Sequence, residues 1–410
     1  MQTIIQTPQL FTDSWWDNLL EGTNYLTGPV TIKNSIPRDL FTEEDLSYIF
    51  RQIPHRHQFN QPSFRVYVGH GQQAKEMIEF YRNPMREDES LYQFTNRIFG
   101  DDRFGVILNN TTDLHPDLGK RLAPFYKGLT EKLGLDWVAL NAIMFIGNYG
   151  YTPFGAHYDG AGTSIIHFHL GPGKKVMTLW DEETFIEKTG SRLHYPYPEK
   201  IVPYGTDHII EAYDTFYLPE GPFHIGNTEE FSMALTISIN GITVKDWLVS
   251  AIAEMNSNAF NPEILVSHET NIDEVFSQEI INHEVKDLPF SHLIKTAMED
   301  YQLSIKSNCG FQVPRWSDNQ TYNDLANQRI QAVQPFQMYY KALNDNQVRL
   351  YFRRNKQNFT EANAIIPIIE QLNDGQTLEV GQVLAQNSAS KEYLSEFFTL
   401  LLNHQAIELA

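Results

Sequence analysis

Between residues 28 and 245 the chain is a series of short runs rich in β-branched and aromatic residues, separated by Gly, Pro and Asn. Clear examples are "PVTIKN", "FRVYVG", "FGVILNN", "WVALNAIMFIGN", "SIIHFHL", "KKVMTLW", "TFYLP" and "FSMALTISI". Many short strands joined by turns predict a β-sandwich or barrel. Helical spacing in "TEEDLSYIFRQI" and "DLGKRLAPFYKGLTEKLG" predicts added helices, and Thr42 followed by Asp45 predicts the N-terminal cap of the first one. We therefore expect a mainly β domain with some helix over residues 1–245.

Two further regions follow. From 246 to 335 the apolar residues recur with helical spacing, as in "VKDWLVSAIAEM", "NIDEVFSQEIINHEV" and "SHLIKTAMEDYQLSI". Over 336–410, "FQMYYKALNDNQVRLYFRRN" alternates about an Asn-Asp-Asn turn and predicts a hairpin. A helix, a short element, a longer helix and a closing strand "AIELA" come after it. That order resembles a small winged-helix unit, so we expect three domains: 1–245, 246–335 and 336–410.

Charge and cysteine content exclude several classes of protein. The net charge of −20, from 51 acidic and 31 basic residues, opposes binding to nucleic acid or to anionic membranes. Residues 360–410 contain seven acidic residues and one basic residue, Lys391, so this tail would repel phosphates. No apolar run is long enough for a membrane span, and the first residues do not resemble a signal peptide. With Cys309 as the single cysteine, we expect a reducing, cytoplasmic setting.

The stretch "GAHYDGAGTSIIHFHLGPGKKVMTLW" contains the most specific candidate for a metal site. In a strand, side chains two apart share a face, so His157 and Asp159 can reach one point. His224, at the start of a later strand in "DTFYLPEGPFHIGN", can supply a third ligand. Two imidazoles and one carboxylate form the three-ligand face of Fe(II) oxygenases, which leaves coordination positions open.

Other residues of the same stretch leave alternatives open. His167 and His169 repeat the same-face spacing, so they are either rival metal ligands or residues of the core or substrate pocket. Lys174 and Lys175 precede the apolar strand "VMTLW". A lysine that points into a barrel is costly unless it meets an anion, which favours a carboxylate ligand.

The sequence resembles the JmjC-type 2-oxoglutarate oxygenases, and among them the ribosomal-oxygenase-like, cupin-type hydroxylases. The motifs that carry the resemblance are His157-Tyr158-Asp159, Gly173 to Lys175, and "YLPEGPFH" ending in His224. The opening "FTDSWWDNLLEGTNYLTGPVTIKNSIPRDLFTEEDL" is similar as well. The middle helices resemble that subgroup's dimerisation region, and the end resembles its winged helix. The resemblance therefore extends over nearly the whole chain.

The resemblance implies a double-stranded β-helix (cupin or jelly-roll) core and a homodimer. It implies that His157, Asp159 and His224 hold Fe(II), and that Lys175 pairs with the distal carboxylate of the cosubstrate 2-oxoglutarate. An insertion after the His-X-Asp motif leaves Lys174 as a substitute, and Asn141 is a further candidate cosubstrate contact. The implied reaction uses O2 to hydroxylate an amino-acid side chain, such as Arg, His, Asn or Asp, in a protein or peptide.

Two other functions remain open at this point. A non-redox metal-binding cupin, such as an isomerase or a binding protein, would often use more histidines, and His167 and His169 could supply them. An oxygenase that acts on a free small molecule would carry the same motif. Four aromatic side chains near the motif could line the cavity or belong to the core, namely Phe154, Tyr158, Phe168 and Trp180.

Overall fold

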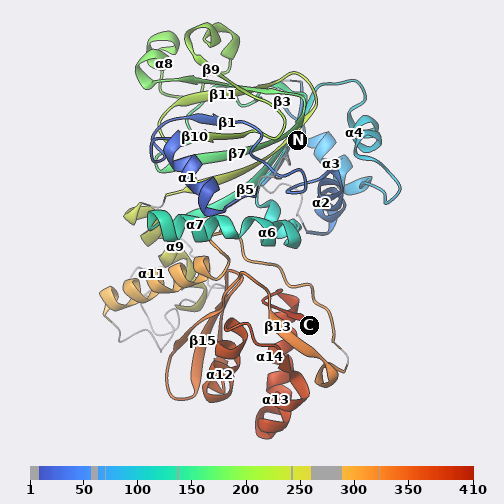
Figure 1. Cartoon of the computed structure of the whole chain (residues 1–410), viewed down its shortest axis with the longest axis vertical. Coiled ribbons are helices and arrows are strands. Elements are labelled where there is room, and N and C mark those ends of the chain that lie inside the picture. Colours follow the sequence, from blue (N-terminus) through green and yellow to red (C-terminus); the bar gives the residue numbers. More distant parts are fainter. Residues whose placement is uncertain are drawn as a thin grey trace, which may run out of the picture. The chain divides into compact units, whose positions relative to one another are not determined.

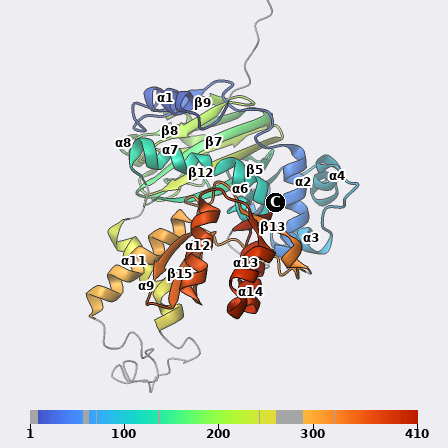
Figure 2. The same ribbon diagram turned by 60° about the horizontal axis from the view of Figure 1, so that its bottom comes forward.

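The computed structural model describes residues 9–56, 63–69, 71–135, 138–241, 243–259, 289–322 and 324–410. The chain folds into two compact units. Unit 1 is Met1–Gly241 with Phe311–Val313, and unit 2 is Ile242–Gly310 with Pro314–Ala410. Figures 1 and 2 show both units as ribbons.

Unit 1 is built on eight consecutive strands that are divided equally between two antiparallel sheets. Strands β5 (Ala139–Gly147), β7 (Thr163–Pro172), β10 (Thr215–Leu218) and β12 (Ser232–Asn240) belong to the larger sheet. Strands β6 (Gly150–Tyr151), β8 (Lys175–Trp180), β9 (Thr206–Ile210) and β11 (Phe223–Thr228) form the smaller sheet, in the order β6-β11-β8-β9. Two facing sheets with four core strands each, between which the chain passes back and forth, make a jelly roll. The prediction of a double-stranded β-helix is confirmed.

The larger sheet extends beyond the jelly roll on both sides. Its eight strands run in the order β1-β10-β7-β12-β5-β4-β2-β3. The additional strands are β1 (Val30–Ile32), β2 (Phe64–Val68), β3 (Gly71–Gln72) and β4 (Phe104–Leu108). Strand β12 is paired along its whole length with β5 on one side and β7 on the other, which explains why its residues are almost all buried.

Helices cover the outer face of the larger sheet. They are α1 (Asp13–Gly22), α2 (Glu43–Arg56), α3 (Ala74–Arg82), α4 (Leu91–Phe99), α5 (Thr111–Leu114), α6 (Pro116–Leu122) and α7 (Pro124–Leu133). The helix between β8 and β9, α8 (Glu182–Thr189), packs instead on the smaller sheet, where Phe185 stacks on Phe223 of β11. Trp16 of α1 stacks on Phe125 of α7 with ring centroids 5.0 Å apart. Gly128 of α7 lies so close to Trp16 that a Cβ would overlap the indole. These helices therefore bury aromatic side chains on that face and leave the inner face to the second sheet.

The predicted cap of α2 is present. The backbone N–H of Asp45 donates to Thr42 Oγ1 at 3.3 Å, and the backbone N–H of Thr42 donates to the Asp45 carboxylate at 2.7 Å. This is the reciprocal arrangement of a capping box, with Asp in place of the usual Glu. Asp45 also binds Arg121 of α6 at 2.6 Å, so the cap fixes α2 to a neighbouring helix.

Unit 2 begins with α9 (Val244–Ala259) and α11 (Phe290–Lys306). The predicted helix "NIDEVFSQEIINHEV" lies outside the described residues. Strands β14 (Tyr339–Ala342) and β15 (Gln347–Phe352) form the predicted hairpin, and β16 (Asn355–Thr360) joins them. A second sheet has the order β17-β13-β18, from β13 (Arg329–Ala332), β17 (Leu378–Glu379) and β18 (Ile407–Leu409).

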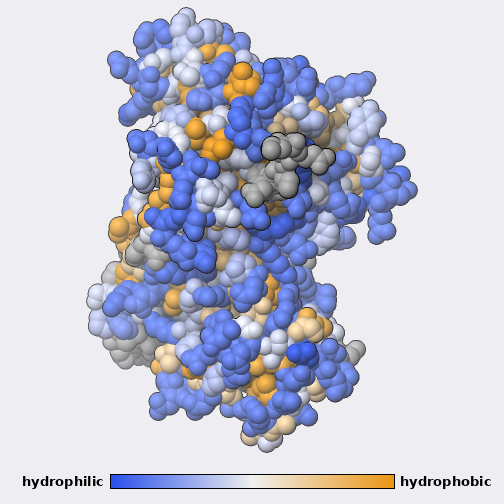
Figure 3. All heavy atoms as spheres, viewed as in Figure 1, coloured by the Kyte–Doolittle hydropathy of each residue, from blue (hydrophilic) through white to orange (hydrophobic). Residues whose placement is uncertain are grey.

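Helices α12 (Ala362–Asn373), α13 (Val380–Gln386) and α14 (Lys391–Asn403) share an apolar core with these strands. The predicted element order of the tail is therefore observed, while its description as a winged helix and the dimerisation role of 246–335 stay predictions. None of the helices described is both long and apolar enough to cross a membrane. The face of the molecule in Figure 3 is mostly hydrophilic, with scattered apolar side chains.

Candidate metal centre and binding cavity

His157 and His224 lie directly opposite each other. Their backbones exchange two hydrogen bonds, from His157 N to His224 O at 3.1 Å and from His224 N to His157 O at 2.8 Å. His224 is the second residue of β11, whereas His157 lies in the segment between β6 and β7. This pairing brings the two imidazole centroids to 4.4 Å, although many residues separate them in sequence.

Asp159 completes the cluster from a loop. Its carboxylate oxygens lie 3.3 Å from His157 Nε2 and 3.6 Å from His224 Nε2. The predicted position of Asp159 is in the same strand as His157, and here the structure differs. Pairing ends at His157, and Gly160 takes φ +98, a conformation suited to glycine. The predicted residues are nevertheless brought together, with one ligand atom of each within 4.8 Å of the others.

The hydrogen bonds of the two histidines orient both Nε2 atoms toward the shared point. Nδ1 of His157 lies 3.0 Å from the carbonyl of Gly155, and Nδ1 of His224 lies 3.4 Å from that of Pro222. A carbonyl only accepts, so each Nδ1 carries a proton and Nε2 is the nitrogen able to bind a metal. The arrangement therefore selects the tautomer that a divalent cation needs.

The ionisation of the cluster also suits a cation. Burial lowers the pKa of His224 to about 4, against the opposing effect of the Asp159 charge, so this imidazole is neutral near pH 7. For Asp159, burial acts to raise the pKa, but the adjacent imidazoles of His157 and His224 lower it below its usual value. A neutral nitrogen and an ionised carboxylate are the protonation states that metal binding requires. The donor set thus fits a divalent metal ion.

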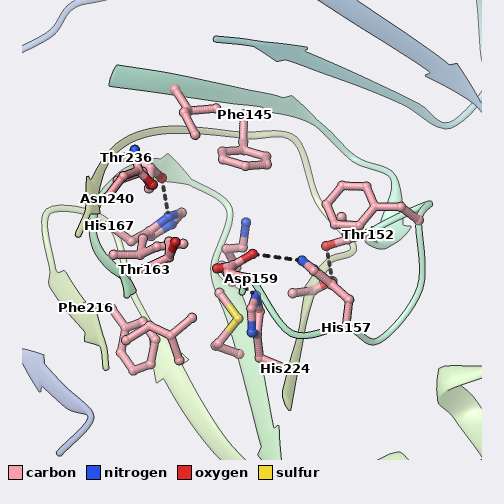
Figure 4. A pocket seen from close by; sticks show the side chains of 18 of the residues that line it. Phe145, Thr152, His157, Asp159, Thr163, His167, Phe216, His224, Thr236 and Asn240 are labelled. Carbon is pink, nitrogen blue, oxygen red and sulfur yellow. Dashed lines mark hydrogen bonds and ion pairs between the residues drawn. The ribbon is translucent and has the colours of Figure 1, made fainter. Parts of the chain in front are cut away.

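The cluster forms part of the wall of a cavity of about 500 Å³ between the two sheets. In Figure 4, His157, Asp159 and His224 point toward one another, and His167 with Thr236 lies elsewhere on the wall. Apolar side chains supply much of the remaining surface, among them Ile143, Phe145, Met177, Phe216 and Leu218. A mostly apolar cavity with a few converging polar groups is typical of small-molecule and cofactor sites.

Lys175, the first residue of β8, lines this cavity and is only 3% exposed. Its Nζ donates to Tyr149 Oη at 3.1 Å and lies 5.0 Å from the centroid of the Phe145 ring. Gly226 makes room for it, since a Cβ there would be 2.7 Å from Lys175 Cε. Within the described part of the chain no carboxylate pairs with this ammonium. Lys174 is exposed, so Lys175 is the lysine that faces the cavity.

His167 and His169 lie apart from the metal cluster. His167 is buried in the cavity wall with Nδ1 2.9 Å from Thr236 Oγ1, and burial together with the charge of Lys175 lowers its pKa. His169 is fully buried, and its Nε2 donates to the Gly173 carbonyl at 2.6 Å. Neither imidazole belongs to the group of ligand atoms that converges at Asp159.

Of the other residues predicted to contact a ligand, only some line the cavity. Asn141 is not among the residues that line the cavity; its side-chain oxygen accepts from the backbone N–H of Asn110 at 2.8 Å. Of the four aromatic candidates, Phe154 lines the cavity. Tyr158 is 38% exposed, and Phe168 and Trp180 are buried in the core.

Several lining residues escaped the sequence argument, notably Arg65, Phe145 and Phe216. Each lies in a predicted strand, and alternation along "FRVYVG" could have placed Arg65 opposite the buried Phe64 and Val66. The pairing of β2 with β4 and of β4 with β5 aligns Arg65 with Phe145. No local sequence pattern predicts this pairing between distant strands.

Comparisons with known proteins give structural neighbours alone. No protein-family model and no curated protein sequence match the chain. Similar solved structures are those of YcfD, a ribosomal oxygenase from Escherichia coli, at 13% identity and a TM-score of 0.48, covering 96% of this chain and 97% of that one. Its complex with cobalt and succinic acid has 13% identity and a TM-score of 0.49, and that with cobalt and 2-oxoglutarate has 14% and 0.48; each covers 96% of this chain and 98% of the other. Because the sequence identities and TM-scores are this low, the function is inferred from the metal cluster and cavity of this chain.

Proposed function

We propose that this protein is an Fe(II)- and 2-oxoglutarate-dependent oxygenase that hydroxylates an amino-acid side chain of a protein or peptide. The observation that carries the proposal is the combination, in one cavity, of two oriented imidazole nitrogens, one carboxylate and the buried ammonium of Lys175. A metal site alone would fit many functions. The additional unpaired cation favours a bound carboxylate.

His157, Asp159 and His224 would hold the iron. Because three protein ligands leave coordination positions open, a cosubstrate and O2 can both reach the metal. When bound, the iron and 2-oxoglutarate supply the activation of O2 that inserts an oxygen atom into a C–H bond, with succinate and CO2 as coproducts. The carbonyls of Gly155 and Pro222 keep both imidazoles in the required tautomer, which is the role of outer hydrogen bonds at metal sites.

Lys175 would bind the carboxylate of 2-oxoglutarate that is remote from the metal. Phe145 and Met177 line the same cavity, so little water competes for the ammonium. Charge-assisted hydrogen bonds are stronger in such surroundings than at the surface. Tyr149 Oη, 3.1 Å from Nζ, fixes the direction of the lysine.

Features of the sequence support proposals about the substrate and the assembly. The motifs of His157 to Asp159 and of His224 resemble those of enzymes that modify protein side chains, which favours a protein or peptide over a free small molecule. We further propose a homodimer formed through residues 246–335. A cytoplasmic location agrees with the single cysteine, Cys309, which is buried and has a free thiol.

Mass spectrometry tests the proposed reaction. Cell-extract proteins and candidate peptides are incubated with the protein, Fe(II) and 2-oxoglutarate under ¹⁸O2, with the Asp159→Ala variant as the control. We expect a gain of one labelled oxygen on a substrate only with the unmodified protein. A metal-dependent product formed without consumption of 2-oxoglutarate would instead identify a non-redox cupin.

A further inference from the structure

Arg65 brings a second basic side chain to the cavity. It lies in β2, where Phe64 and Val66 are buried toward the helices, with the Phe64 ring 5.1 Å from that of Phe80 in α3. Arg65 therefore points to the opposite, inner face of the sheet, and it is part of the cavity lining. In register it aligns with Ile107 of β4, which aligns with Phe145 of β5.

The guanidinium of Arg65 has few partners. Among the residues that the structure describes, its one hydrogen bond, from Nη2 to Asn109 Oδ1, is long at 3.4 Å, and its buried Nε has no acceptor. In the described part of the chain no carboxylate pairs with it. Other arginines of this acidic protein do pair, as Arg97 does with Glu89 at 2.7 Å and Arg121 with Asp45 at 2.6 Å. A half-buried guanidinium without an anion is costly, which suggests that a ligand supplies one.

The two cations of the cavity come from different elements. Lys175 enters from β8 of the smaller sheet, next to Phe145. Arg65 enters from the extension of the larger sheet, two strands away from Phe145. If 2-oxoglutarate uses one carboxylate at the metal and the other at Lys175, no anionic group of the cosubstrate remains for Arg65. The guanidinium is then available to the substrate.

We propose that Arg65 forms a second anion subsite, which binds a carboxylate of the substrate and so positions the C–H bond to be oxidised. This inference rests on the proposed function and narrows its substrate class to molecules with an acidic group near the reacting carbon. The planar fork of a guanidinium matches a carboxylate with two parallel hydrogen bonds. The carboxylate belongs either to an Asp or Glu side chain of a peptide or to a free amino-acid derivative.

Binding measurements on the Mn(II)-loaded protein test the subsite without turnover. One pair of probes is N-acetyl-aspartate methylamide and N-acetyl-asparagine methylamide, and a second is a capped hexapeptide library with Asp or Glu at a central position and its Asn or Gln counterpart. We expect at least about tenfold tighter binding of the carboxylate member, the scale of a hydrogen bond to a charged group. Preference with the capped amino acids identifies a small acidic substrate, and preference with the peptides alone identifies an acidic peptide.

The variants locate the preference. Arg65→Gln should abolish it, Arg65→Lys should keep part of it because the charge remains, and Arg82→Gln, an exposed arginine at the end of α3, should leave it unchanged. Affinity for 2-oxoglutarate, measured separately, should change less than about twofold in Arg65→Gln, because its anchor is Lys175. Melting temperatures of the variants show that each is folded.

Three results would overturn the proposal: no carboxylate preference in either pair, a preference that survives in Arg65→Gln, or a loss of 2-oxoglutarate affinity in Arg65→Gln as large as in Lys175→Ala. The last would make Arg65 part of the cosubstrate site. Failure of the proposed function is distinguishable, because the protein would then not bind 2-oxoglutarate while an Arg65-dependent carboxylate preference could still be measured.

Discussion

Truncation of Lys175 is the sharpest test of the cosubstrate site. Lys175 is 3% exposed, and the one hydrogen bond that its ammonium makes with a described residue is to a tyrosine hydroxyl. Loss of one partner from a buried charge pair costs about 2 to 4 kcal/mol, so Lys175→Ala should weaken 2-oxoglutarate binding by a factor of about 30 to 1000. Lys174 is exposed, and a surface charge contributes about 1 kcal/mol or less. Lys174→Ala should therefore change the affinity by about fivefold at most.

Calorimetric titration of 2-oxoglutarate into the Mn(II)-loaded protein measures both variants, and the melting temperature gives an independent readout. The cosubstrate should stabilise the unmodified protein by mass action. Lys175→Met should raise the melting temperature of the ligand-free protein, since it removes a buried charge that has no anion, and should abolish the stabilisation by 2-oxoglutarate. If Lys174→Ala has the larger effect, or if neither variant matters, the assignment of Lys175 is refuted.

Three further predictions concern other parts of the molecule. His169→Ala should leave metal affinity largely intact, whereas His224→Ala should abolish it; equal loss of bound iron would show that the ligand set is wrong. Burial acts to raise the pKa of Asp45, but the hydrogen bonds from Arg121 and Thr42 outweigh burial and lower this pKa from 3.8 to about 2. Its ionised form therefore stabilises the fold above pH 4, and this contribution of about 2 kcal/mol is lost as the pH falls toward 2; Asp45→Asn should remove that part of the pH dependence in urea unfolding. Sedimentation at micromolar concentration should show a dimer, and a stable monomer would refute the role of 246–335.

Local patterns in the sequence predicted the parts of the fold that depend on neighbouring residues. The β-type runs around "SIIHFHL" and "FSMALTISI" became β7 and β12, and the cap at Thr42 formed as expected. Strand β6, with two residues, is too short to show any alternation. The order of strands in the sheets depends on pairing between distant segments, so the resemblance to a family, and not periodicity, pointed to the jelly roll.

Some residues of the site could likewise be predicted from local sequence patterns, and others could not. His157, Asp159 and His224 were identified because the chemistry of the metal requires their residue types and spacing. The loop position of Asp159 was missed because a glycine ends the extended segment after it, and sequence alternation alone cannot show this. Arg65 was missed because its place in the cavity depends on β4 lying between β2 and β5.

The central claim is that His157, Asp159 and His224 form the iron site of a 2-oxoglutarate oxygenase, and succinate release tests it most directly. The purified protein is incubated with Fe(II), 2-oxoglutarate and O2, and succinate is quantified beside parallel reactions of His157→Ala and Asp159→Ala. We expect succinate that depends on Fe(II) and O2 in the unmodified protein, and none above background in either variant, because loss of one ligand of three breaks the facial geometry. Full turnover in either variant, or an iron-loaded unmodified protein that releases no succinate, would contradict the claim.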